Sequence, residues 1–190
     1  YPDAHPYLWE VSTLQFEEKN VFQPTILRAN YLSRVMVMHS FVAPDPLFIK
    51  EDIPFIKLWL FRAAQKQDLL EIARYEATLS KWLVTVWLLF VAVGGALFLK
   101  NLFKQDNRFP FAFIFIVLFS FVLHMRYGRD VFLYSTNWTY AITLFLALAW
   151  HEIANKRWFQ IPLFAFIAFQ MINNSRLIFF MLISAYLHLR

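Results

Sequence analysis

Four polar side chains lie close to the middle of a long apolar stretch near the C-terminus. Gln170, Asn173, Asn174 and Arg176 interrupt residues 161–190, which are long and apolar enough for a helix that crosses a lipid bilayer. At 100° per residue the three amides fall on one face of that helix, with Arg176 at its flank. Because a charged side chain at the bilayer centre costs at least about 2.5–3.5 kcal/mol, we expect Arg176 to face protein or water.

Two kinds of chemistry fit this polar face. As a binding site, it would hold an anionic substrate on Arg176 or form a proton path together with a carboxylate. As a structural device, the amides would form hydrogen bonds across a helix interface. The predicted membrane spans contain no internal Asp or Glu to pair with Arg176. We therefore predict that Gln170, Asn173, Asn174 and Arg176 contact another subunit or a lipid phosphate; the alternative is that Arg176 lies nearer the membrane surface than the helix register indicates.

A second group of candidate contact residues occupies residues 124–130, between two apolar stretches. It contains His124, Arg126 and Arg129, with Tyr127 between the arginines. Two guanidinium groups beside an aromatic ring suit a lipid phosphate, such as a cardiolipin headgroup, or acidic residues of a neighbouring protein. Simple anchoring of the helix ends at the membrane surface fits the segment equally well.

Motifs for catalysis or metal binding are not recognisable in the sequence. The chain has no cysteine, which excludes thiolate metal sites and disulfides, and its five histidines are dispersed. A nucleophile elbow, a Gly-rich phosphate loop and a pair of carboxylates in a plausible cleft are all missing. We predict a protein that is not an enzyme and has no resident cofactor or metal, although it can bind a phospholipid such as cardiolipin.

The polar residues must be positioned by elements that are mostly apolar. Of the 190 residues, 59% are hydrophobic and 20% aromatic, whereas an ordinary globular domain is roughly 45–50% apolar. This excess predicts burial in a membrane. Short connections between the apolar stretches predict antiparallel neighbours. Four stretches have the length and flanking basic residues expected of membrane spans: residues 82–99, 109–123, 131–150 and 161–190.

The N-terminal part of the chain is more polar and richer in proline. Residues 1–25 are predicted to form an extended arm, and residues 25–42 and 52–79 are predicted helices. An apolar arm without its own core is expected to lie on a partner subunit or on the membrane. The predicted fold class is an all-α integral membrane protein, in which a membrane-apposed helical region (1–79) precedes a unit of four transmembrane helices (80–190).

The net charge of +5 favours an anionic lipid surface or acidic partner subunits. Nucleic acid is excluded as a partner because the basic residues are dispersed singly. The sequence begins at Tyr1, without an initiator methionine, and residues 1–20 lack the features of a signal peptide or an intact transit peptide. We expect that a targeting segment has been removed, which points to an organelle; the alternative is a piece of a longer chain.

These features together predict a non-catalytic accessory or structural subunit of a multi-subunit membrane complex. Its partners would be other membrane protein subunits and membrane lipids. The first candidate is an oxidative-phosphorylation complex of the mitochondrial inner membrane, such as a respiratory complex or ATP synthase. The alternative is a small multi-span transporter or a membrane-embedded enzyme that uses the polar face of the last helix. A third hypothesis is a fragment of a longer multi-span enzyme.

Overall fold

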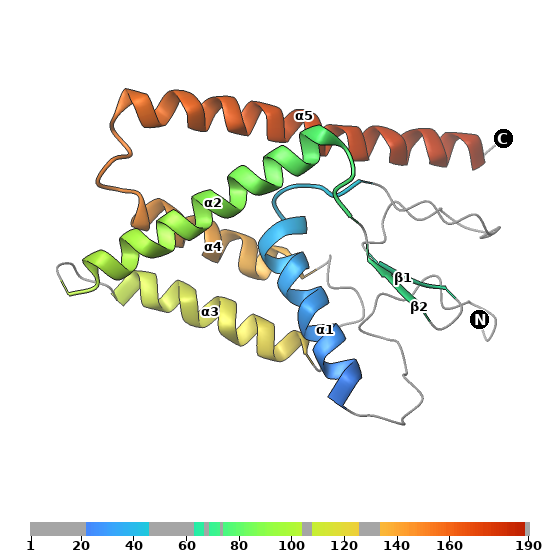
Figure 1. The fold of residues 1–190 in the computed structure, drawn as a ribbon, viewed down its shortest axis with the longest axis horizontal. Helices are drawn as coiled ribbons and strands as arrows, with labels where there is room; N and C mark the ends of the chain where they lie inside the picture. The colour runs from blue at the N-terminus through green and yellow to red at the C-terminus, as the bar shows by residue number, and fades with distance from the viewer. Residues whose placement is uncertain are drawn as a thin grey trace.

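The part of the chain that the structure describes is helical apart from one short hairpin and the connecting turns (Figure 1). The structure, a computed structural model, describes residues 22–45, 63–66, 69–72, 74–103, 108–125 and 134–188. The elements in chain order are α1 (Phe22–Arg34), the π-helical turn η3 (Val35–His39), β1 (Ala63–Lys66), β2 (Leu69–Ile72), α2 (Thr78–Asn101), α3 (Arg108–His124), α4 (Thr136–Ala149) and α5 (Arg157–His188).

The helix α2 lies at the centre of the arrangement. It packs against α4 and α5, and α3 and α4 pack against each other. The α1 helix contacts α3, and η3 contacts α2. In Figure 1, α5 crosses α2 at an angle and extends well beyond the N-terminal end of α2 toward the C-terminus. The turn after η3 is thereby enclosed by residues from several helices.

Two helices are long and apolar enough to cross a membrane by length and composition. They are α2, with 24 residues, and the Arg157–Phe179 part of α5, with 23. A hydrocarbon core of about 30 Å needs about 20 helical residues. The α3 helix is also apolar but has 17 residues, and α4 has 14. Each of the four predicted spans therefore corresponds to a helix, and two of the four helices reach spanning length.

The N-terminal predictions have mixed outcomes. The helix predicted over residues 25–42 is confirmed for most of its length, since α1 and η3 run continuously to His39. The helix predicted over residues 52–79 is wrong. Its described part contains β1 and β2, which pair antiparallel with Ala63 opposite Ile72. Ala, Leu, Gln, Lys and Glu fill most of residues 63–72 and are among the strongest helix formers, but helix propensity is a weak signal, and backbone pairing in the hairpin overrides it here. The predicted arm (1–25) lies almost wholly outside the described residues.

One hydrophobic core joins the N-terminal helix to the apolar helices that follow. Its members come from α1, η3 and the next turn and from α2, α4 and α5; the most enclosed are Tyr31, Leu32, Val35, Val42, Leu83 and Trp138, all at 0% exposure. The core therefore crosses the predicted boundary between residues 79 and 80. Large apolar side chains of α3 and α5 remain outside it, among them Phe119 at 68% and Phe164 at 70% exposure. Surfaces of this kind are typical of contact with lipid or another protein.

Candidate functional site

An irregular stretch of buried backbone follows η3 and forms the centre of the site. The π-helical turn closes with a bond from Ser40 N–H to the Val35 carbonyl at 3.0 Å. Phe41, Val42 and Ala43 then leave the helix while remaining buried. Because unpaired backbone groups are costly away from water, this turn needs partners for each N–H and carbonyl that regular structure would have satisfied.

The amides of α5 supply most of those partners. Gln170 Nε2 and Asn174 Nδ2 both donate to the Phe41 carbonyl, at 2.6 and 2.9 Å. Asn174 Oδ1 accepts from the Ala43 N–H at 2.9 Å, and Asn173 Nδ2 donates to the Ala43 carbonyl at 2.9 Å. We call these three amides, together with residues 41–43, the polar clamp. The amides share one helix face, as the sequence predicted, and they hold a turn of their own chain; their contact with a partner subunit or lipid stays a prediction.

Aromatic side chains complete the bonding of the same segment. Trp87 Nε1 of α2 donates to the Val37 carbonyl at 2.6 Å. The Tyr75 hydroxyl donates to the Val42 carbonyl at 2.8 Å, and Trp138 Nε1 of α4 donates to Ser40 Oγ at 3.1 Å. The sequence analysis did not identify these residues. The available signal was that a buried Trp or Tyr has one polar atom that normally finds a partner.

Asp45 connects the end of this turn to the start of α2. Its Oδ2 accepts from the N–H groups of Glu76 and Ala77, at 2.5 and 2.9 Å, and from Ser80 Oγ at 2.8 Å. Ala77, at the N-cap position, has no side chain that could make these bonds. Asp45 therefore caps α2 from a distant part of the chain, and its charge is favourable at a helix N-terminus.

The electrostatic surroundings hold Asp45 in its ionised form. Partial burial alone would raise the pKa of Asp45. The bonds from Ala77, Glu76 and Ser80, together with the positive charge of Arg176, outweigh burial and lower the pKa below its ordinary value of 3.8. Arg176 itself is exposed.

The position of Arg176 differs from the sequence-based prediction. Its charge acts on a carboxylate of the same chain, which lies outside the predicted spans. Because Asp45 caps the first turn of α2, Arg176 lies near the N-terminal end of that candidate span rather than at mid-depth. This position agrees with the alternative that places Arg176 nearer the membrane surface, and its contact with another subunit or a lipid phosphate stays a prediction.

Substituting Asp45 with asparagine should destabilise the fold by about 0.3–1 kcal/mol at neutral pH, because the amide keeps an acceptor oxygen for the cap but loses the negative charge at the helix N-terminus. Because the folded-state pKa is lowered, the carboxylate stabilises the protein above pH 3.8, and this contribution is lost as the pH falls through the folded-state value. Detergent-solubilised wild type should thus lose stability below about pH 4, more steeply than Asp45→Asn. If the free energy of unfolding falls equally in the two proteins between pH 6 and pH 3, the Asp45 carboxylate does not stabilise the fold in this way.

His124 is buried within the described part of the chain. It is 3% exposed, its Nδ1 lies 2.7 Å from the Ser120 carbonyl, and its ring contacts Tyr134 and Trp138. Its own carbonyl accepts from Arg28 Nε and Nη2, at 3.1 and 2.6 Å. A guanidinium at the C-terminal end of α3 is electrostatically favourable. The structure encloses this side chain within the described part of the chain, and its contact with a lipid or a partner stays a prediction.

Arg126 and Arg129, the other two predicted contact residues of that loop, lie outside the described residues. Within the described part of the chain, no group of three or more His, Asp or Glu side chains is placed to hold a metal ion.

Comparisons with models of protein families, with curated proteins and with solved structures each gave no match. The function must therefore be inferred from the geometry of the described residues.

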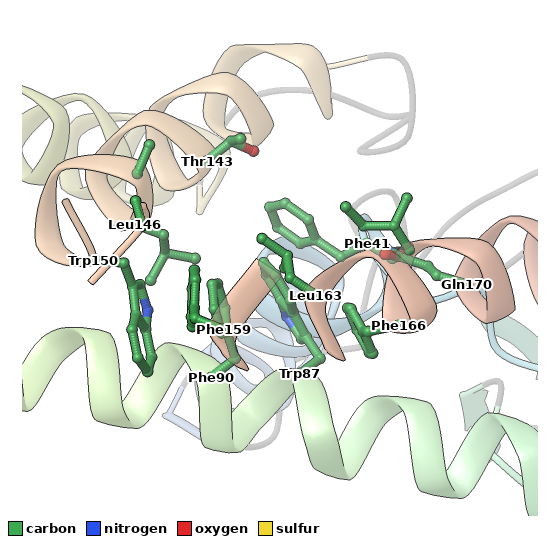
Figure 2. Close-up of a pocket in the computed structure, with 13 residues that line it drawn as sticks. Phe41, Trp87, Phe90, Thr143, Leu146, Trp150, Phe159, Leu163, Phe166 and Gln170 are labelled. Carbon is green, nitrogen blue, oxygen red and sulfur yellow. Dashed lines mark hydrogen bonds between the residues drawn. The ribbon is translucent and has the colours of Figure 1, made fainter. Parts of the chain in front are cut away.

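An apolar groove lies directly beside the polar clamp. Its volume is about 430 Å³. In Figure 2, side chains of α2, α4 and α5 converge on it, with Trp150 at one end and Gln170 at the other. We call it the aromatic groove. It is lined by Phe41, Trp87, Phe90, Thr143, Leu146, Ala147, Trp150, Ala154, Phe159, Leu163, Phe166, Ile167 and Gln170.

Stacked rings give the aromatic groove its walls. Phe41 stacks on Trp87 with ring centroids 4.2 Å apart. Farther along, Trp150 stacks on Phe90, at 4.8 Å, and on Phe159, at 5.0 Å, and these two phenyl rings lie 6.2 Å from each other, so the three rings form one cluster. Aromatic pairs at these distances add stabilisation beyond the burial of their surface. The groove is therefore a built apolar surface that suits a hydrophobic ligand better than an ion.

Proposed function

We propose that this chain is a non-catalytic structural subunit of a larger membrane protein complex. The polar clamp is the observation that supports this best. The amides of Gln170, Asn173 and Asn174, which would otherwise be the natural lining of a transport path, are used to hold backbone groups of residues 41–43. Polar groups used in this way serve helix association rather than the passage of a substrate.

The surface of α5 adds to the proposal. Within its Arg157–Phe179 part, only 11% of the most apolar 18-residue segment is buried inside the chain. Phe164, Met171 and Phe179 are each more than 60% exposed. A helix with so much uncovered apolar surface must be covered by lipid, by a partner protein or by both. A subunit that docks through α5 would cover part of this surface.

The finer details of the proposal concern topology and location. We propose that α3 and α4 also cross the membrane, which gives four spans. The 17 residues of α3 extend about 25 Å, and the exposed Arg108 at its start can extend to the headgroups. The mitochondrial inner membrane is the proposed location, with an oxidative-phosphorylation complex as the first candidate. The positive net charge supports an anionic membrane of this kind.

A transporter or membrane-embedded enzyme is the alternative function. The observation in its favour is that Gln170 both belongs to the polar clamp and lines the aromatic groove. A substrate in the groove would therefore meet one polar side chain beside stacked rings. This function requires the groove to open and close, and the clamp would have to rearrange.

Native gel electrophoresis after mild-detergent extraction tests the subunit proposal. We expect the chain to migrate in a stoichiometric assembly with other membrane proteins, identified by mass spectrometry. Photo-crosslinking residues introduced at Phe164, Met171 and Phe179 should give a protein adduct from at least one position. The same probe at Phe166, which is 8% exposed, is the matched control and should give none. The proposal would be contradicted if the chain migrates as a monomer or small homo-oligomer and the photo-crosslinking probes give lipid adducts only.

A further inference from the structure

A second hollow adjoins the aromatic groove. It has a volume of about 220 Å³. Four residues line both hollows: Phe90, Phe159, Leu163 and Phe166. The two spaces are thus separated only by shared side chains. The remaining lining of the second hollow consists of Val86, Trp158 and Pro162.

The lining of both hollows suits hydrocarbon chains. Neither contains a charged side chain, and the amide of Gln170 and the hydroxyl of Thr143 are the main polar groups. Both hollows lie against α2 and α5, the two candidate spans, so in a membrane their open sides would face lipid tails. A volume of about 430 Å³ lies within the usual range of about 300–1,000 Å³ for sites that bind small hydrophobic molecules.

Two basic residues are close in sequence to residues that line these hollows. Lys156 and Arg157 lie in sequence between Ala154 and Phe159, which both line the aromatic groove, and both basic side chains are exposed. The nearby carboxylate of Glu152 accepts a hydrogen bond from Asn101 Nδ2 at 3.1 Å. Positive charge beside an apolar hollow is the arrangement that recognises an anionic headgroup with attached acyl chains.

We propose that these features bind one anionic phospholipid from the surrounding bilayer. Its two acyl chains would occupy the two adjoining hollows, and its phosphate would lie at Lys156 and Arg157. Two hollows that share a wall suit a lipid with two chains better than a single rigid ring system. This site is separate from the loop at residues 124–130. It requires a membrane location but no particular complex, so it stands or falls independently of the subunit proposal.

Lipid titration of the purified full-length chain, followed by native mass spectrometry, tests this site. The probes are phosphatidylglycerol and phosphatidylcholine with identical acyl chains. We expect an affinity about thirtyfold higher for phosphatidylglycerol, from two basic residues near the headgroup. Lys156→Gln/Arg157→Gln should bring the two lipids to about equal affinity. The matched control, Arg74→Gln/Lys81→Gln, removes two exposed basic residues near the other end of α2 and should keep the preference.

A second pair of variants tests the hollows themselves. Ala147 lines the aromatic groove, so Ala147→Phe should weaken binding of both lipids by at least about tenfold, equivalent to losing about two buried methylene groups. Ala165 is exposed on α5 and lines neither hollow, so Ala165→Phe should bind like wild type. Equal affinity for both lipids in the wild type, equal losses in test and control variants, or a bound molecule other than a phospholipid would each overturn the proposal.

Discussion

Asn174→Leu should lower the free energy of unfolding by about 2–3 kcal/mol, because it leaves a buried donor without an acceptor. Asn174 Oδ1 accepts from the Ala43 N–H at 2.9 Å, and its Nδ2 donates to the Phe41 carbonyl at 2.9 Å. After the substitution, the Phe41 carbonyl keeps its bond from Gln170. The Ala43 N–H loses its side-chain acceptor at a buried position, and a leucine of similar size prevents water from replacing it.

Ser175→Leu is the control for this substitution. Ser175 is the next residue on α5 and is exposed, so leucine there changes the apolar content of the helix equally without reaching the turn. Unfolding in mixed micelles, followed by circular dichroism as the denaturing detergent is increased, gives both free energies. If the two variants unfold alike, the polar clamp does not stabilise the fold.

Gly94→Ala should also be destabilising, by about 1–2 kcal/mol net. A Cβ at Gly94 would lie 2.8 Å from Leu146 Cδ2 and 2.8 Å from Trp150 Nε1. The leucine can rotate away, but the indole packs against both Phe90 and Phe159, and moving it would disturb those contacts. Overpacking of this kind costs about 1–3 kcal/mol. The higher helix propensity of alanine offsets about 0.5–1 kcal/mol of that loss.

The adjacent glycine is a close control. A Cβ at Gly95 would have no heavy atom within 4 Å. Gly95→Ala should therefore show only the propensity gain of about 0.5–1 kcal/mol. The difference between the two alanine variants isolates the contact of α2 with α4, because the propensity term cancels. Equal stabilities would mean that α2 and α4 are not packed closely at Gly94.

The apolar helices of this fold were predictable from the sequence because their signal is local. Each predicted span contains a helix, since a long apolar run has few other ways to satisfy its backbone hydrogen bonds, even where it contains a glycine pair or a proline near its start. The face shared by Gln170, Asn173 and Asn174 was predictable for the same reason, from helical periodicity alone. The backbone groups that these amides bind were not predictable. Nothing in the local sequence of residues 41–43 indicates that this turn is buried against a helix about 130 positions later.

The differences between prediction and structure have separate physical origins. A carboxylate near Arg176 was sought within the spans, whereas the charge of Arg176 acts on Asp45, in a turn that precedes them. The helix predicted through residues 63–72 follows from strong helix formers, and strand pairing replaces it. His124 resembled an interfacial residue because it ends an apolar stretch, but Tyr134 and Trp138 enclose it. The surroundings of Arg176 and His124 depend on other segments of the chain, and the hairpin depends on local strand pairing; helical periodicity reports neither.

The polar clamp sets an order for the biogenesis of this protein. Asn174 is synthesised 131 residues after Ala43, which takes about 7–26 s at about 5–20 residues per second. During that interval the turn at residues 41–43 lacks its final partners, and α1 cannot reach its native enclosure. Chaperones or the insertion machinery must therefore shield a half-assembled bundle until α5 emerges. A nascent chain stalled before Gln170 should remain a substrate for quality-control proteases. A chain long enough for residue 188 to have emerged from the ribosome should be resistant.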